Sequence, residues 1–194
     1  AGALLRLPAG ILTDRLGGRA AMSVILLFSA LPCYLLSTAH SYTQLLTYAL
    51  LFGLAGNSFS IGIAWNSAWF SKQRQGAALG TFGAGNVGAS MTKLLGPAVL
   101  AAVPAAGLLG GFIPGGWRAV PVFYSGLLVL MAAVVWFASP RPERTPGAGR
   151  PLAEMLAPLK EVRVWRFGLY YVVVFGAYVS LSLWLPSYYI DVYA

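Results

Sequence analysis

The chain has 194 residues, of which 58% are hydrophobic and only 9% are charged. Soluble domains carry about 25% charged residues, so this composition excludes an ordinary soluble domain and indicates a protein surrounded by lipid. The net charge of +8 does not indicate a nucleic-acid interface, because the basic residues lie in short clusters between long apolar stretches. The single cysteine, Cys33, can form no internal disulfide, and we expect a buried thiol there.

Six apolar segments follow one another along the chain. The first, residues 1–13, contains Arg6 and is short for a membrane span, which needs about 20 residues. It begins with Ala and lacks the basic start and cleavage site of a signal peptide, so we interpret it as the second half of a helix. The five later segments are long enough to span: residues 20–38, 45–70, 76–103, 120–138 and 167–189.

The Lys and Arg residues are concentrated in alternate loops. Ten of the thirteen lie in three of the five loops, whereas the loops 39–44 and 104–119 hold only Arg118. The positive-inside rule predicts that the basic loops are cytoplasmic, in a multi-pass protein of the cytoplasmic (inner) membrane. These basic loops are residues 14–19, 71–75 and 139–166.

The longest basic loop divides the chain. We interpret residues 139–166 as a central cytoplasmic linker, with residues 1–138 in an N-terminal helical half and residues 167–194 as the first helix of a second half. Within the linker, residues 154–166 form either an amphipathic helix on the membrane surface or part of a solvated segment.

Two cations, Arg6 and Lys93, lie inside apolar segments. A charge in the bilayer is costly and normally faces a partner or a water-filled cavity. Arg6 shares a helical face with Gly2, Gly10 and Thr13, and this small, polar face should point into the bundle. Because no acidic residue lies inside an apolar segment, we favour an anion-binding arginine over one paired with a carboxylate on a helix outside this chain.

The fourth segment has five glycines in its first thirteen residues. Glycines in a membrane helix allow close helix packing, and they also leave room for a small substrate. Asn86, Ser90 and Lys93 share one face of this helix. A polar stripe beside a glycine-rich surface, which includes Gly83 and Gly85, favours a substrate pathway over packing alone.

The sequence contains no catalytic constellation. Its Cys, His and acidic residues are not at metal-ligand spacing, and it has no pair of buried acids. Residues 83–88 match GxGxxG superficially but follow no strand, so a dinucleotide fold is rejected. We therefore predict a protein that is not an enzyme and that needs no metal or cofactor.

Three motifs carry a family resemblance. Residues 12–19, Leu-Thr-Asp-Arg-Leu-Gly-Gly-Arg, resemble the G-x-L-x-D-R-x-G-R-R loop after the second helix of the major facilitator superfamily, with Gly10 in its first position and one extra glycine. Residues 80–88, Gly-Thr-Phe-Gly-Ala-Gly-Asn-Val-Gly, follow residues 70–76 and, together with Arg-Leu-Pro at 6–8, resemble the nitrate/nitrite porter (NarK-type) family. The glycine-rich element resembles the nitrate signature in the fifth helix of that family.

This resemblance covers the whole chain and implies an incomplete all-α polytopic membrane protein, about half of a twelve-helix transporter. The chain would run from the middle of the second helix through the seventh, without the first helix. The helices outside this chain would hold the rest of the anion site, and the 194 residues alone are predicted not to transport.

The resemblance also implies a site for nitrate or nitrite between the two halves. Arg6 matches the second-helix arginine that binds the anion, Phe59 the fourth-helix aromatic beside it, and Asn86 the asparagine of the signature. Tyr171 and Phe175 match hydroxyl and aromatic contacts of the seventh helix. A planar, singly charged anion suits the two-pronged guanidinium group.

The expected function is secondary transport of nitrate, nitrite or both by alternating access. Lys93 resembles a fifth-helix lysine of a subgroup thought to carry nitrate with protons, so we favour proton symport over nitrate/nitrite exchange. Transport of another small anion and a transporter-derived membrane sensor are the alternatives. Gly83, Gly85, Ser90 and Lys93 are candidates for the pathway or coupling, and Asp14, Arg15, Arg19, Lys72 and Arg74 for the loops that bracket a cytoplasmic gate.

Overall fold

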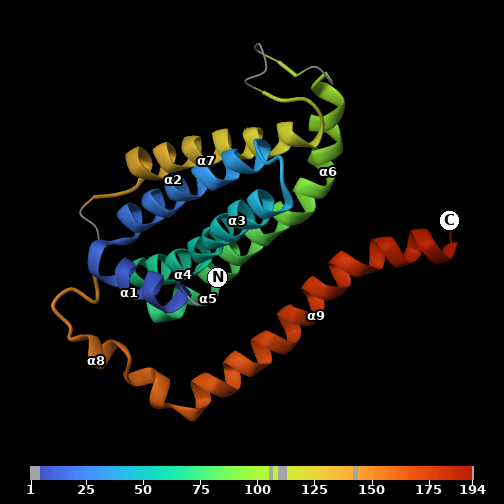
Figure 1. Cartoon of the computed structure of the whole chain (residues 1–194). Helices are drawn as coiled ribbons and strands as arrows, with labels where there is room; N and C mark the ends of the chain where they lie inside the picture. Colours follow the sequence, from blue (N-terminus) through green and yellow to red (C-terminus); the bar gives the residue numbers. More distant parts are fainter. Residues whose placement is uncertain (1–4, 105–106, 109–112, 142–143, 194) are drawn as a thin grey trace. The chain divides into compact units, whose positions relative to one another are not determined.

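The computed structural model describes residues 5–104, 107–108, 113–141 and 144–193 (Figure 1). The chain forms two compact units, Ala1–Ala148 and Gly149–Ala194, and each is described by itself. The regular elements of the described residues are helical, apart from one isolated bridge between Leu108 and Ile113. Among the described residues, four helices are long and apolar enough to cross a membrane: Gly18–Ser37, Tyr42–Trp69, Gly116–Ala138 and Val162–Tyr193.

The first two helices are separated by one glycine. Helix α1 spans Arg6–Leu16 and α2 spans Gly18–Ser37, with Gly17 between them at a φ of 91°. This backbone conformation favours glycine, and the Gly17 N–H donates to the Thr13 carbonyl at 2.9 Å. The predicted loop 14–19 is therefore wrong in its bounds, because a single glycine reverses the chain and the basic residues lie in helical turns.

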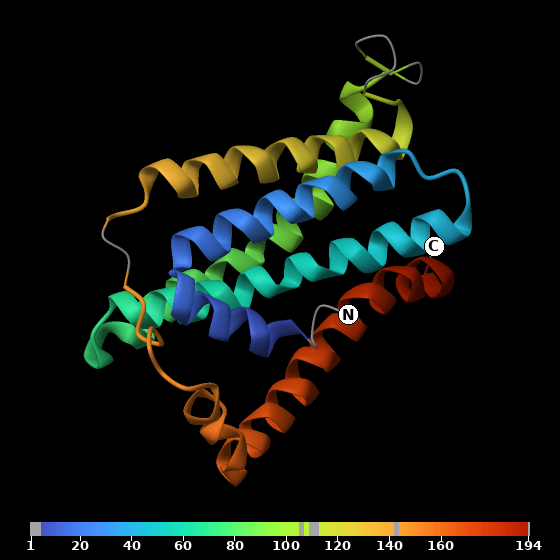
Figure 2. The same ribbon diagram turned by 60° about the vertical axis from the view of Figure 1, so that its left-hand side comes forward.

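The third predicted segment is one long rod (Figure 2). It consists of α3 (Tyr42–Phe52), a 3₁₀ turn η2 (Gly53–Gly56) and α4 (Asn57–Trp69). The Ser41 side chain accepts from the Gln44 N–H at 3.3 Å and starts the rod, as an N-cap serine does.

The fourth predicted segment is also a helical rod. It consists of α5 (Lys72–Gly83), η3 (Ala84–Asn86) and α6 (Val87–Ala102). It is not among the four long apolar helices, because Asn86, Lys93 and the glycines lower its mean hydropathy. The predicted loop 71–75 is wrong in its bounds too, since the Ser71 carbonyl already accepts from the N–H groups of the next turn, at residues 74 and 75.

The first unit is held together mainly by α2 and α7 (Ala119–Ala138), which lie side by side in Figures 1 and 2. Small residues fill this interface. Ala132 is 2% exposed, and its carbonyl accepts from Ser23 Oγ at 3.3 Å. Cys33 is buried, as predicted. Close packing through small residues, with large apolar side chains turned outward, is typical of helices in lipid.

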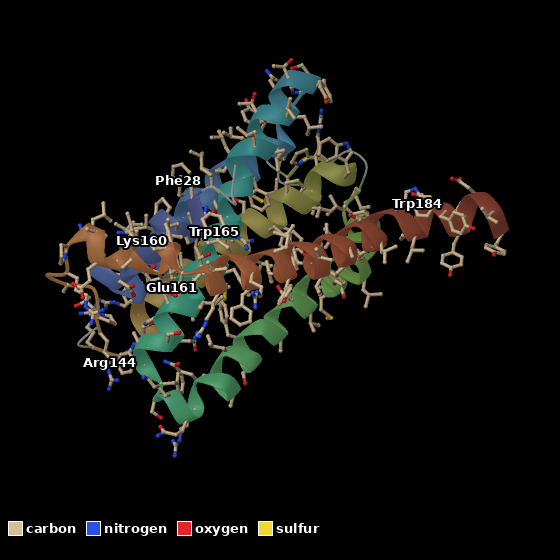
Figure 3. All side chains as sticks on the ribbon, turned by 90° about the horizontal axis from the view of Figure 1, so that it is seen from below. Phe28, Arg144, Lys160, Glu161, Trp165 and Trp184 are labelled. Atoms are coloured by element: carbon tan, nitrogen blue, oxygen red, sulfur yellow. The ribbon has the colours of Figure 1, made fainter. Side chains whose placement is uncertain are left out.

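The second unit contains α8 (Leu152–Met155), η6 (Ala157–Lys160) and α9 (Val162–Tyr193). Residues 154–166 do not form one amphipathic helix, because the chain leaves the helical pattern at Leu156 and Glu161. Helix α9 begins five residues before the predicted Phe167, and the Trp165 indole donates to the Leu159 carbonyl at 2.7 Å. Side chains project outward along α9 (Figure 3).

Candidate functional site

Arg6 opens α1 and is half-buried. Its Nε is enclosed and has no hydrogen-bond partner among the described residues. Gly10 is half-buried and Thr13 is 2% exposed, which agrees with the prediction that this face of α1 points into the bundle. Gly2, the remaining member of that face, lies outside the described residues. Helix α1 packs against α4.

Phe59 lies on α4 and stacks on Phe82 of α5. Their ring centroids are 5.6 Å apart and the rings are inclined by 28°. Gly62, one turn further along α4, is buried, and a Cβ atom there would overlap the Phe82 ring. The two helices therefore approach closely at this point, and the Phe59 ring lies against α5.

Asn86 ends η3 and is exposed within the first unit, as are Ser90 and Lys93. A Cβ atom added at Gly83 or Gly85 would meet nothing within 4 Å among the described residues. Packing inside this unit therefore does not require those two glycines, and the polar stripe lies along an open surface.

Tyr171 and Phe175 lie one turn apart on α9. Their rings stack at 5.2 Å and are nearly parallel, with 9° between their planes. Both are exposed within the second unit, by 45% and 37%. The pair offers a flat aromatic surface with one phenolic hydroxyl at its edge.

The basic stretches 14–19 and 71–75 lie at one end of the first unit, with the part of the third stretch that belongs to this unit, residues 139–148. Arg19 lies over the Trp136 ring at 4.5 Å and donates to its carbonyl at 3.5 Å. The Gly147 N–H donates to the Asp14 carbonyl at 3.1 Å, which brings the segment after α7 onto the end of α1. Arg15 lies in the last turn of α1, and Lys72 and Arg74 lie in the first turn of α5.

Arg144 completes this end of the unit. Its guanidinium lies over the Trp69 ring at 4.8 Å, and its Nη1 donates to the carbonyls of Ala68 and Trp69 at 3.3 and 3.5 Å. These carbonyls belong to the last turn of α4, which has no helical partner for them. The sequence pattern does not predict this role, because an arginine in a loop and a tryptophan at a helix end give no sign that the two are in contact.

The other two loops meet at the opposite end. The Arg118 Nη2 donates to the Ala39 carbonyl at 2.7 Å, and its guanidinium lies over the Trp117 ring at 5.6 Å. The single cation of the non-basic loops thus closes the end of α2. This separation of the two loop sets agrees with the alternation predicted from charge.

Replacing Arg144 with alanine should loosen the segment after α7. Loss of one cation–π contact and of exposed charged hydrogen bonds corresponds to about 1 kcal/mol. The amide of Gly147 should then exchange with deuterium about fivefold faster. Hydrogen exchange followed by mass spectrometry measures this effect. Arg141→Ala is the matched control, because Arg141 is an exposed arginine of the same segment. Equal exchange rates of the Gly147 amide in the two variants would contradict the role assigned to Arg144.

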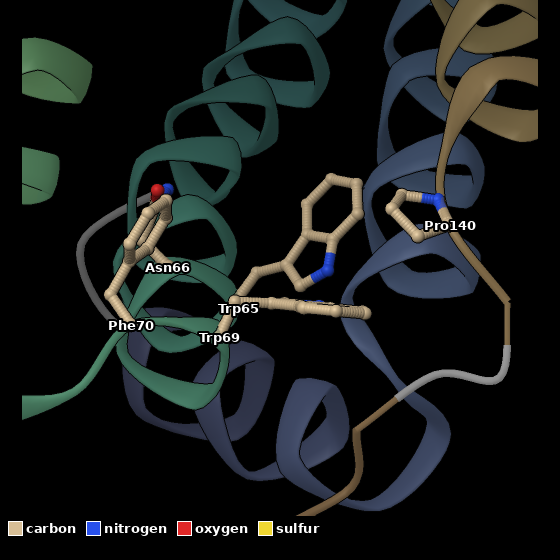
Figure 4. Close-up of a pocket in the computed structure, with 5 residues that line it drawn as sticks. All are labelled: Trp65, Asn66, Trp69, Phe70 and Pro140. Atoms are coloured by element: carbon tan, nitrogen blue, oxygen red, sulfur yellow. The ribbon is translucent and has the colours of Figure 1, made fainter.

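Two grooves border α4. The first has a volume of about 320 Å³ and lies between α4 and Pro140, with the indoles of Trp65 and Trp69 on the proline side (Figure 4). The second, of about 490 Å³, lies between α4 and α5 and is lined by Asn66, Phe70, Arg74, Ala77, Ala78, Thr81 and Phe82. Among the described residues, the lining of these two grooves does not include Arg6, Phe59 or Asn86.

The comparison with protein families decides the fold class. The profile of the Major Facilitator Superfamily matches residues 1–194. The chain belongs to this superfamily. Its helical fold agrees with the membership, and the superfamily is one of transporters and not of enzymes. No solved structure matches the chain.

Individual proteins with similar sequences show which branch of the superfamily this chain resembles. It is 65% identical over 192 residues to the "Probable nitrate/nitrite antiporter NarK1" of Thermus thermophilus, covering 99% of this chain and 43% of that protein. It is 28% identical to the "Nitrite extrusion protein" of Bacillus subtilis, with 98% and 45% covered. It is 32% identical to the "Probable nitrate/nitrite transporter NarK2" of Mycobacterium tuberculosis, with 99% and 47% covered.

These relatives confirm the resemblance to nitrate/nitrite porters that rested on the glycine-rich element. The chain spans less than half the length of each relative.

Proposed function

We propose that this chain forms part of a nitrate/nitrite transporter of the cytoplasmic membrane, which works by alternating access. The observation that carries the proposal is the enclosed Nε of Arg6 on the inward face of α1, which has no hydrogen-bond partner in the described part of the chain. The printed names of the relatives support nitrate and nitrite as the substrates.

The chemistry of the site follows from its side chains. The Arg6 guanidinium supplies a fixed charge and a planar set of donors, which match the oxygens of nitrate. Phe59 offers an apolar ring face to a delocalised planar ion, and Asn86 supplies an amide donor. The second unit, taken by itself, carries the stacked pair Tyr171 and Phe175, which offers a hydroxyl donor and a flat ring face. Because the chain spans less than half the length of each relative, further contacts to the anion are proposed to come from the rest of such a transporter.

The orientation in the membrane follows from the loops. The end that holds Arg19, Arg144 and Lys72 is proposed to be cytoplasmic, because Lys and Arg accumulate on that side. Asp14, Arg15 and Arg74 belong to the same end and are proposed to border the cytoplasmic gate.

The coupling mode is proposed to be exchange of nitrate for nitrite. The name of the Thermus thermophilus relative, at 65% identity, supports this mode. The second candidate is nitrate–proton symport, which rests on the resemblance of Lys93 on α6 to a lysine of a subgroup thought to carry nitrate with protons.

Proteoliposomes that contain the full-length protein should separate the two modes. For exchange, external nitrate enters quickly only when the vesicles are loaded with nitrite, and a pH gradient alone drives no uptake. Labelled nitrate uptake is measured with and without internal nitrite, at equal and unequal pH. Uptake into empty vesicles that follows the proton gradient would replace exchange by symport. Absence of nitrate and nitrite transport in every condition would sink the proposed function itself.

A further inference from the structure

The aromatic stack between α4 and α5 is formed by Phe59 and Phe82, and its geometry depends on the absence of a side chain at Gly62. Phe82 lies face to face with Phe59, at 5.6 Å and 28°, an arrangement that offset aromatic pairs favour. Gly62 follows Phe59 by three residues and lies on the same side of α4. Since a Cβ atom at Gly62 would overlap the end of the Phe82 ring, this glycine provides the space in which the ring sits.

Phe82 lies between two residues of the proposed site, because it contacts Phe59 and precedes Asn86 on the same rod. It lies one turn before Asn86 on the continuous rod of α5 and η3. It also borders the groove of about 490 Å³ that it shares with Thr81 and Arg74. Contact with Phe59 on one side and a groove on the other leaves Phe82 as the residue that fixes the Phe59 ring from the α5 side.

We propose that Phe82 is a positioning residue of the anion site, which acts by holding the Phe59 ring in one orientation on a seat provided by Gly62. The inference rests on the proposed function, in which the Phe59 face lies against the planar anion. Without a stacked neighbour, the ring gains rotational freedom. Fixing it again on binding then weakens the affinity for the anion, while the arginine and the transport cycle are unchanged.

The test measures nitrate KM and Vmax for variants of the full-length protein in proteoliposomes, with the amount of folded protein determined by size-exclusion chromatography. Phe82→Leu is expected to raise KM about three- to tenfold, the range that loss of an aromatic pair gives, with Vmax per folded protein kept within about twofold. Phe82→Met keeps the side-chain volume without a ring, and it should give the same KM if the leucine variant folds poorly.

Gly62→Ala supplies an independent variant. Its added methyl group displaces the Phe82 ring and should raise KM as Phe82→Leu does. In the double variant Gly62→Ala/Phe82→Leu, the shorter side chain leaves room for the methyl group. Its KM should therefore equal that of Phe82→Leu alone, because the two residues act through one contact. Additive increases would indicate two unrelated effects and would overturn the shared-seat explanation.

Two controls separate the possible failures. Phe123→Leu removes one ring of another aromatic pair with a centroid distance of 5.6 Å, Phe123 and Tyr124, and should leave KM unchanged. Phe59→Leu tests the anion contact itself. If Phe59→Leu raises KM and both Phe82→Leu and Phe82→Met leave it within twofold of wild type, the positioning role is wrong. If Phe59→Leu also leaves KM unchanged, the proposed site is wrong.

Discussion

Replacing Arg6 with lysine is expected to lower nitrate transport by at least about 100-fold, although the positive charge is kept. A guanidinium donates two parallel hydrogen bonds to neighbouring oxygens of a planar anion, whereas an ammonium is a point charge that cannot match this geometry. Loss of the fixed pair of charged hydrogen bonds corresponds to about 3 kcal/mol, which is more than a hundredfold. The enclosed Nε of Arg6 has no hydrogen-bond partner among the described residues. No partner of this nitrogen is therefore seen that could orient a lysine side chain at the same position.

The measurement is initial nitrate uptake by the full-length protein, normalised to the amount of folded transporter in the membrane. Arg163→Lys is the matched control, because it replaces the same guanidinium with the same ammonium at a residue that is exposed in the second unit. The variant at Arg163 should keep wild-type uptake. If Arg6→Lys transports nitrate at more than about a third of the wild-type rate, Arg6 acts only through its charge and the guanidinium geometry is not used.

Sequence patterns predicted the helices well, because hydropathy reports directly on burial in lipid. They predicted the loops poorly. Clusters of charge were interpreted as loops at 14–19 and 71–75, but a helix end tolerates Arg15 or Lys72, and a single residue such as Gly17 suffices to turn the chain. Charge marks the membrane boundary, whereas the backbone decides where a helix ends.

Some residues of the proposed site could be predicted from the sequence and others could not. Arg6 and Asn86 could be proposed from sequence, because a cation and an amide in apolar segments are conspicuous against their neighbours. Phe82 and Arg144 could not, because their roles depend on contacts with Phe59 and Trp69 on other helices. An aromatic or basic residue has the same local pattern whether or not a partner faces it, so such contacts require the packed structure.

Replacing Ala132 with phenylalanine is expected to destabilise the first unit by at least about 2 kcal/mol. Ala132 is 2% exposed in the contact between α2 and α7, where its carbonyl accepts from Ser23 Oγ. A large ring there must separate the two helices or adopt a strained rotamer, and overpacking of this kind costs about 1–3 kcal/mol or more. The separation would also break the serine hydrogen bond and expose small-residue surfaces whose stability depends on close approach.

The melting temperature in detergent, followed by the loss of the monodisperse size-exclusion peak on heating, should fall by about 4–8 °C. Val134→Phe is the matched control, because Val134 lies two residues away on α7 and is 45% exposed, on the surface available to lipid. That variant adds a similar apolar volume without a packing partner to displace, so its melting temperature should stay within about 2 °C of wild type. Equal melting temperatures for the two variants would mean that α2 and α7 do not pack through Ala132. The assignment of α7 residues to the interior of the helix bundle or to its lipid-facing surface would then be wrong.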